Sequence, residues 1–173
     1  MAAPWDPYDA LPPVPSFLLT SFELRDGDEL DVRQSAAHDI SPSLAWSGFP
    51  AETKSFAVTC FDPDAPTASG WWHWFVYDIP ATVHSLPVGA GDEAGAGLPE
   101  GAKHLVIDSG SRGYRGAWPP VGHGVHRYFF AVHALGVEQL PISPDSTPGA
   151  AGGAVTWNTL ARAIIVGTYR RDN

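Results

Sequence analysis

Prolines and glycines interrupt this sequence at short intervals from one end to the other. The 173 residues include 17 prolines and 18 glycines. Proline breaks helix interiors and sheet ladders, and glycine favours turns, so long helices are disfavoured. The chain is still 44% hydrophobic, which suits a packed core rather than a disordered chain. We therefore expect a single domain over residues 1–173 that is mainly β, with short strands in a mixed or antiparallel sheet.

Runs of apolar and β-branched residues indicate where the strands lie. The predicted strands are 17–20, 44–46, 55–61, 73–79, 104–108, 126–135 and 164–169. In the third of these, Phe56, Val58 and Cys60 share one face because successive side chains of a strand alternate. Residues 87–102 and 141–153 are rich in Gly, Pro or Ser and are predicted to be loops. One helix is predicted over 156–163, with Thr156 as its N-cap.

The charge balance limits the partners that suit this chain. The formal net charge is -9 and the isoelectric point is near 5.0, which disfavours nucleic acids and anionic membrane surfaces. A bound anion is therefore expected to be small and held in a local pocket. Cys60 is the only cysteine and is predicted to be a buried structural thiol. The first residues do not resemble a signal peptide and no run is long enough to span a membrane, so we expect a cytoplasmic protein.

Two short segments concentrate the residues that could carry chemistry. The first, around Asp62 and Asp64, is followed by His73; the second contains His126, Arg127 and Tyr128. If the second segment is extended, His126 and Tyr128 point to one face, roughly 6–7 Å apart along the strand. An imidazole and a phenol at that spacing can both donate hydrogen bonds to one oxyanion.

The acidic residues of the first segment have natural partners in the second. We predict a bidentate ion pair between Asp64 and Arg127 that ties the two segments together. We also predict that Asp62 lies beside His73 or His126, where a carboxylate would fix the tautomer and raise the histidine pKa. The plainer alternative is that both aspartates only form turns and that His73 is a core histidine bonded to a carbonyl.

Other chemistries have weaker support in the sequence. A metal site would draw on Asp62 and on four histidines, namely His73, His123, His126 and His133. The spacing of His123 and His126 suits a helix better than this glycine-rich segment, so we expect no metal and no other cofactor. Neither motif contains a serine or cysteine to act as a nucleophile, which argues against covalent catalysis. Trp71 and Trp72 are expected to be core residues, or to line a pocket mouth or a dimer interface.

Three stretches together resemble the phosphatidylethanolamine-binding protein family, in particular its bacterial Raf-kinase-inhibitor-like branch. They are 62–66 (Asp-Pro-Asp-Ala-Pro), 72–75 (Trp-His-Trp-Phe) and 119–128, which runs from the paired prolines to His126-Arg127-Tyr128. The likeness extends from Leu11 near the start to Tyr169 near the end.

The resemblance implies an antiparallel β-sandwich with one or two short helices and a small anion pocket at one end. By motif, the pocket would be lined by Asp62, His73, Trp118, Pro120, His126 and Tyr128, with Asp64 and Arg127 as a structural brace. Trp118 would contribute its backbone amide, and its side chain is expected to narrow the pocket, because Ala117-Trp118 stands where the family commonly has Gly-Pro. Relatives in this branch are often homodimers, so a homodimer is expected.

The sequence supports a non-enzymatic binding protein as the first hypothesis. Its ligand would carry a phosphate, phosphoethanolamine or carboxylate group, and binding would regulate a protein partner. A second hypothesis is a hydrolase or isomerase that uses an Asp–His pair for acid–base chemistry. A third, inhibition of a protease or kinase through the surface, rests on the family resemblance alone.

Overall fold

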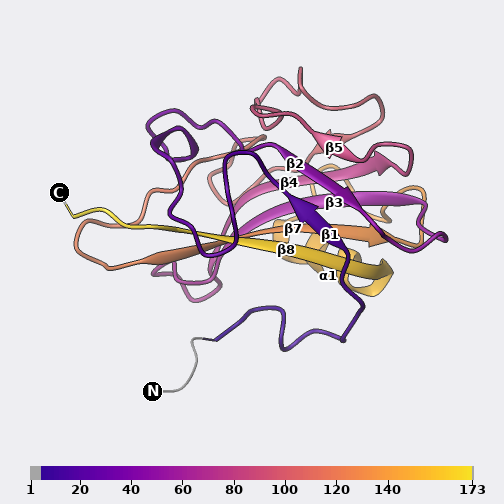
Figure 1. Cartoon of the computed structure of the whole chain (residues 1–173), viewed down its shortest axis with the longest axis horizontal. Coiled ribbons are helices and arrows are strands. Elements are labelled where there is room, and N and C mark those ends of the chain that lie inside the picture. Colours follow the sequence, from indigo (N-terminus) through magenta and orange to yellow (C-terminus); the bar gives the residue numbers. More distant parts are fainter. Residues whose placement is uncertain (1–4, 173) are drawn as a thin grey trace.

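The computed structural model, which describes residues 5–172, consists of two antiparallel β-sheets and one α-helix (Figure 1). The larger sheet has the strand order β6-β4-β3-β7-β8. Its strands are β3 (Ser55–Asp62), β4 (Trp71–Pro80), β6 (Lys103–His104), β7 (His126–Leu135) and β8 (Thr159–Tyr169). The smaller sheet, ordered β1-β2-β5, contains β1 (Leu18–Thr20), β2 (Leu44–Ser47) and β5 (Ser85–Leu86). The antiparallel, mainly β architecture expected from the sequence is confirmed.

The central strand β3 is buried along its whole length and separates two apolar layers. Phe56, Val58 and Cys60 belong to the core between the two sheets, together with Trp46 of β2. Ala57 faces the opposite layer, where side chains of the larger sheet pack against the helix α1 (Pro148–Asn158). The predicted alternation of β3 therefore sets up a face that meets the second sheet and a face that meets the helix.

The predicted helix boundaries are wrong. The helix begins at Pro148, eight residues before the predicted Thr156 N-cap, because Thr147 caps it by accepting a hydrogen bond from the Ala150 amide. Proline is well suited to the first helical position. Residues 159–163, predicted to be helical, instead begin β8, where they pair with β7 from Leu135 back to Val132. Long-range pairing thus prevails over local helix propensity, and the predicted loop 141–153 contains the first half of the helix.

Smaller differences concern the short strands. The strand predicted at 104–108 is reduced to Lys103–His104, with Val106 forming only an isolated bridge to Arg112. Residues 87–102 form the expected loop of successive turns. Within residues 5–172, no helix is long and apolar enough to cross a membrane.

Candidate functional site

Asp62 lies at the end of β3, where the strand turns toward β4. It pairs with Trp71 in the sheet register and is only 3% exposed. One carboxylate oxygen accepts the Asp64 amide at 2.8 Å, and the other lies 2.8 Å from His126 Nδ1. Gly70 permits the tight return, since a Cβ there would clash with the Phe61 ring and the Gly70 φ angle is +68°. Both Asp62 oxygens are engaged by the protein, so Asp62 positions its neighbours.

His126 opens β7 and links the buried carboxylate to the surface. Because Asp62 accepts at Nδ1, the proton of a neutral His126 ring is assigned to Nδ1 and its Nε2 is an acceptor. This Nε2 lies 2.7 Å from Nδ1 of His123. His123 is exposed and stands between Gly122 and Gly124, whose φ angles of +73° and +94° favour glycine. The result is a continuous chain from Asp62 through His126 to His123.

Tyr128 lies two residues beyond His126 on the same face of β7, as predicted. Its hydroxyl is buried and has no hydrogen-bond partner within the described residues. Burial, assisted by the nearby Asp62 carboxylate, raises the pKa of Tyr128 well above its ordinary value, whereas the adjacent Trp118 backbone lowers it slightly. The phenol therefore stays protonated at neutral pH and retains a donor for an incoming group.

His73, on β4, packs edge-on against the Tyr128 ring with centroids 5.1 Å apart. Its Nδ1 lies 2.7 Å from the Arg115 carbonyl, which fixes the proton on Nδ1. Burial lowers the pKa of His73 and outweighs the opposing effects of this hydrogen bond and of Asp62. Of the two partners predicted for Asp62, the structure has His126 and not His73, so a raised pKa is not found for His73, which is neutral at pH 7. The carbonyl-bonded histidine considered as the plainer alternative is the one observed.

These residues open into a cavity of about 490 Å³ at one end of the sandwich. Trp118 and Pro120 lie at its rim, and the Trp118 side chain is 57% exposed. The Arg171 guanidinium stacks 3.5 Å above the Trp118 ring, a cation–π contact that holds the ring beside the opening. Trp118 therefore narrows the entrance without sealing the cavity. The structure brings all six predicted ligand-binding residues to this one pocket.

Sequence reasoning missed two residues of the site, Arg115 in the pocket lining and His123, which contacts His126. Arg115 binds Asp39 at 3.0 Å and Glu93 at 3.1 Å. Its carbonyl also orients His73, a backbone role that leaves no signature in the sequence. His123 was considered only as a metal ligand, and its contact with His126 depends on the path of a loop. A glycine on each side of a histidine was the one available signal.

Asp64 and Arg127 form the predicted brace. The guanidinium Nε and Nη2 donate to the two carboxylate oxygens at 2.7 and 2.8 Å, and the Arg127 amide adds a third bond at 3.0 Å. Partial burial alone would raise the pKa of Asp64, but the hydrogen bonds from Arg127 outweigh it and lower the pKa. Arg127 also donates to the Trp5 carbonyl at 2.8 Å. The brace thus fastens the N-terminal arm as well as the site.

Two further predictions concern the metal and the tryptophan pair. No group of three or more potential metal ligands gathers in residues 5–172, and His133 lies on the opposite face of β7, bonded to Thr59 and Arg162. Trp71 lines the pocket, whereas Trp72 packs against Phe61 on the other face of the sheet, with ring centroids 4.7 Å apart. The two tryptophans are half-buried and serve different faces.

Comparison with known proteins settles the family. The family model described as phosphatidylethanolamine-binding protein matches residues 20–170. The chain belongs to the phosphatidylethanolamine-binding protein family. It is 45% identical to the UPF0098 protein YbcL of Escherichia coli K12, over 89% of this chain and 87% of that protein. It is also 45% identical to YbhB of the same strain, over 87% of this chain and 98% of that protein.

Solved structures agree with this membership. The crystal structure of E. coli YbcL, described as a new member of the mammalian PEBP family, superposes with a TM-score of 0.87 over 90% of this chain and 98% of that one. A PEBP homolog from Chlamydia trachomatis, CT736, is 30% identical, with a TM-score of 0.75 over 91% of this chain and 99% of that one. The resemblance to the bacterial branch seen in the sequence is therefore confirmed.

Proposed function

We propose that this protein binds small anions, with phosphate, phosphoethanolamine and carboxylate groups as the ligand class, in the pocket formed by His126, Tyr128 and Trp118. The observation that carries the proposal is the buried Tyr128 hydroxyl without a partner. A buried polar group left unpaired costs free energy, and an anionic oxygen at this position would accept its hydrogen bond. The pocket would do this without turning over its ligand.

The histidine chain supports the same proposal. His126 is 1% exposed and lies on the same face of β7 as Tyr128, and Asp62 holds its ring through Nδ1. The other ring nitrogen, Nε2, contacts the exposed ring of His123. An anion that takes the place of the His123 ring would therefore meet His126 Nε2 and the Tyr128 hydroxyl side by side.

The remainder of the cavity suits the amine end of a zwitterionic head group. Trp71 and Trp118 both line it, and an ammonium group is attracted to the face of an indole ring. The cavity of about 490 Å³ is large enough for such a small molecule. In this arrangement the phosphate lies on Tyr128 and His126, and the amine points toward the tryptophans.

The test is calorimetric titration of inorganic phosphate and phosphoethanolamine at pH 6. We expect His126→Ala to weaken binding about tenfold or more, because it removes the ring beside the anion position together with its Asp62 support, and Tyr128→Phe to weaken it about two- to tenfold, because it removes one neutral hydrogen bond. His84→Ala is the matched control, because His84 is exposed and outside the pocket lining. The proposal fails if neither anion binds the wild type, or if both pocket variants bind as well as the control.

One observation favours acid–base catalysis as a second candidate. The chain Asp62–His126–His123 resembles an oriented general base, in which a carboxylate fixes the ring that exchanges the proton. A screen of phosphate and carboxylate esters would reveal it as turnover that is lost in His126→Ala and retained in His84→Ala. Inhibition of a protease or kinase, and a homodimer, remain predictions from the family resemblance.

A further inference from the structure

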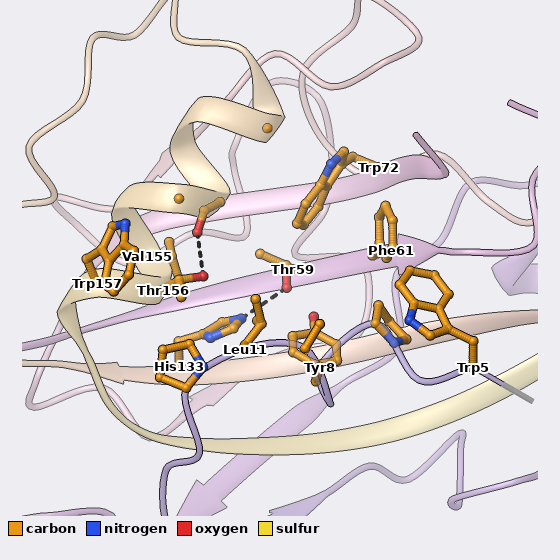
Figure 2. Close-up of a pocket in the computed structure, with 16 residues that line it drawn as sticks. Trp5, Tyr8, Leu11, Thr59, Phe61, Trp72, His133, Val155, Thr156 and Trp157 are labelled. Carbon is orange, nitrogen blue, oxygen red and sulfur yellow. Dashed lines mark hydrogen bonds between the residues drawn. The ribbon is translucent and has the colours of Figure 1, made fainter. Parts of the chain in front are cut away.

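A second cavity, of about 480 Å³, lies on the opposite face of the larger sheet (Figure 2). Its walls come from three elements that are distant in the sequence. The N-terminal arm contributes Trp5, Tyr8 and Leu11, the sheet contributes residues such as Phe61, and α1 covers the remaining side. No aspartate, glutamate, lysine or arginine lines it in the part of the chain that the structure describes. An apolar recess of this size fits a small organic molecule.

The floor of this cavity carries an ordered polar group. Arg162 Nε donates to Nδ1 of His133 at 3.3 Å, so the proton of the neutral ring is on Nε2, which lies 3.3 Å from the Thr59 hydroxyl oxygen (Figure 2). Burial, helped by Arg162, lowers the pKa of His133 to about 3, which keeps the ring neutral. Thr59 therefore accepts from His133 and has its own hydroxyl proton left to donate.

Tyr8, which belongs to the N-terminal arm, lies at the polar end of this cavity. Its ring stacks on the Arg162 guanidinium at 4.9 Å, which holds the arm over the sheet. Burial raises the pKa of Tyr8 to about 12, with a smaller opposing effect from the nearby Thr59 hydroxyl. Two uncharged hydroxyl groups thus lie at one end of an otherwise apolar space, and the pair has a hydroxyl proton to donate to a ligand.

The helix face that covers the cavity is built from glycine. Gly149, Gly152 and Gly153 line the space, although glycine is a poor residue for a helix interior. A Cβ added at Gly149 or Gly153 would meet no described atom within 4 Å, whereas one at Gly152 would lie 3.3 Å from Trp72. Packing within the chain does not require glycine at 149 or 153. Larger side chains at these two positions would project into the cavity and reduce its volume.

We propose that this cavity is a second ligand site, for an uncharged and mainly apolar molecule with one hydrogen-bond acceptor, such as an aromatic ketone. The apolar body would lie between Gly149 and Gly153 of α1 and the ring of Phe61. The acceptor would take the hydroxyl proton of Thr59 or Tyr8. A charged ligand is disfavoured because no charged side chain lines the cavity to compensate for the water that the ligand loses.

The test uses a matched pair of probes, 2-acetylnaphthalene and 2-isopropenylnaphthalene, which have nearly the same shape and differ in one carbonyl oxygen. Binding is followed by two-dimensional NMR of the whole chain. The ketone is expected to shift the amide signals of Thr59, Tyr8 and Gly153 and to leave those of His126 and Tyr128 unchanged. Shifts confined to His126 and Tyr128, or no binding of either probe, would overturn the proposal.

Variants separate filling of the cavity from loss of the fold. Gly153→Leu is expected to weaken ketone binding at least tenfold without lowering the melting temperature, because leucine is the better helix former. Ala150→Leu is the control, since Ala150 is exposed on the same helix and outside the cavity lining. Equal binding by the two leucine variants contradicts the proposal.

The floor is tested separately. Thr59→Val should reduce affinity for the ketone about two- to tenfold while affinity for the hydrocarbon stays unchanged. Equal losses for both probes would contradict the proposed hydrogen bond.

The competing occupant of the cavity is a second copy of the chain, because Trp157 at the rim is 80% exposed. Sedimentation of wild type and Gly153→Leu tests this alternative. Self-association of the wild type that is lost in Gly153→Leu would show that a second copy fills the cavity, and would overturn the proposal.

Discussion

The two cavities have almost the same volume and lie on opposite faces of the same sheet, but their chemistry differs sharply. The pocket proposed to bind anions contains Asp62, His126 and a hydroxyl without a partner among the described residues, whereas the second cavity is lined by uncharged groups. Strand alternation explains the difference, because Thr59 and Asp62 lie three residues apart on β3 and face opposite ways. One strand can therefore supply a titratable site on one face and an apolar site on the other.

The largest effect is expected from Asp62→Ala. This change leaves the buried His126 Nδ1–H and the Asp64 amide without their acceptor, so the free energy of unfolding should fall by about 3 kcal/mol. Urea unfolding measures the loss. At temperatures where the variant remains folded, binding of 2-acetylnaphthalene should be unchanged. A loss of ketone binding by the folded variant would contradict the independence of the two cavities.

Lowering the pH should reduce the free energy of unfolding through His133, at the floor of the second cavity. Its pKa is about 3 when folded, whereas an ordinary histidine titrates near 6.5. Below about pH 6.5 the unfolded chain takes up a proton that the folded chain does not, so stability falls with pH until about pH 3. Between pH 6.5 and 5 the free energy of unfolding should fall by about 2 kcal/mol through His133.

His133→Gln provides the control for this pH effect. Glutamine can replace both hydrogen bonds without titrating, so the loss of unfolding free energy from pH 7 to pH 5 should be smaller in the variant. The pKa values of His73 and His104 are also lowered by burial, so part of the slope should remain. Identical slopes for wild type and variant, measured by urea unfolding, would refute the role assigned to His133.

Arg127→Lys tests the Asp64–Arg127 brace, which joins the segment after β3 to the N-terminal arm beside the second cavity. Lysine keeps the charge but loses the bidentate geometry with Asp64 and the donor to the Trp5 carbonyl. We expect a loss of about 1 kcal/mol in stability and faster hydrogen exchange of the arm amides. Exchange that stays at the wild-type rate would mean that the stacking of Tyr8 on Arg162 is sufficient to hold the arm.

Gly153→Ala should give the smallest effect and the opposite sign. The added methyl group meets open space and improves helix propensity, so the protein should become more stable by about 0.5–1 kcal/mol. Thermal unfolding measures the gain, and phosphate binding should be unaffected. Destabilisation by this change would show that the helix face is more tightly packed than the structure indicates.

Most of the larger sheet was predictable because β3, β4 and β7 carry long alternating apolar patterns. The helix was misplaced because Gly149, Gly152 and Gly153 lower local helix propensity, and the signal at Thr147 and Pro148 was overlooked. Asp62, His126 and Tyr128 were predictable because strand geometry and the family motif agree. The His123 contact, the carbonyl of Arg115 and the whole second cavity depend on how loops, arm and helix come together, which sequence pattern alone does not specify.

The most direct test of the proposed anion pocket is calorimetric titration of sulfate into wild type, Tyr128→Phe and the control His84→Ala at pH 7. Sulfate has no proton to donate, so its oxygens can only accept hydrogen bonds. The account predicts that wild type and His84→Ala bind sulfate equally well, and that Tyr128→Phe, which lacks the donor hydroxyl, binds it about two- to tenfold more weakly. Absence of sulfate binding by wild type, or equal affinity of wild type and Tyr128→Phe, would contradict it.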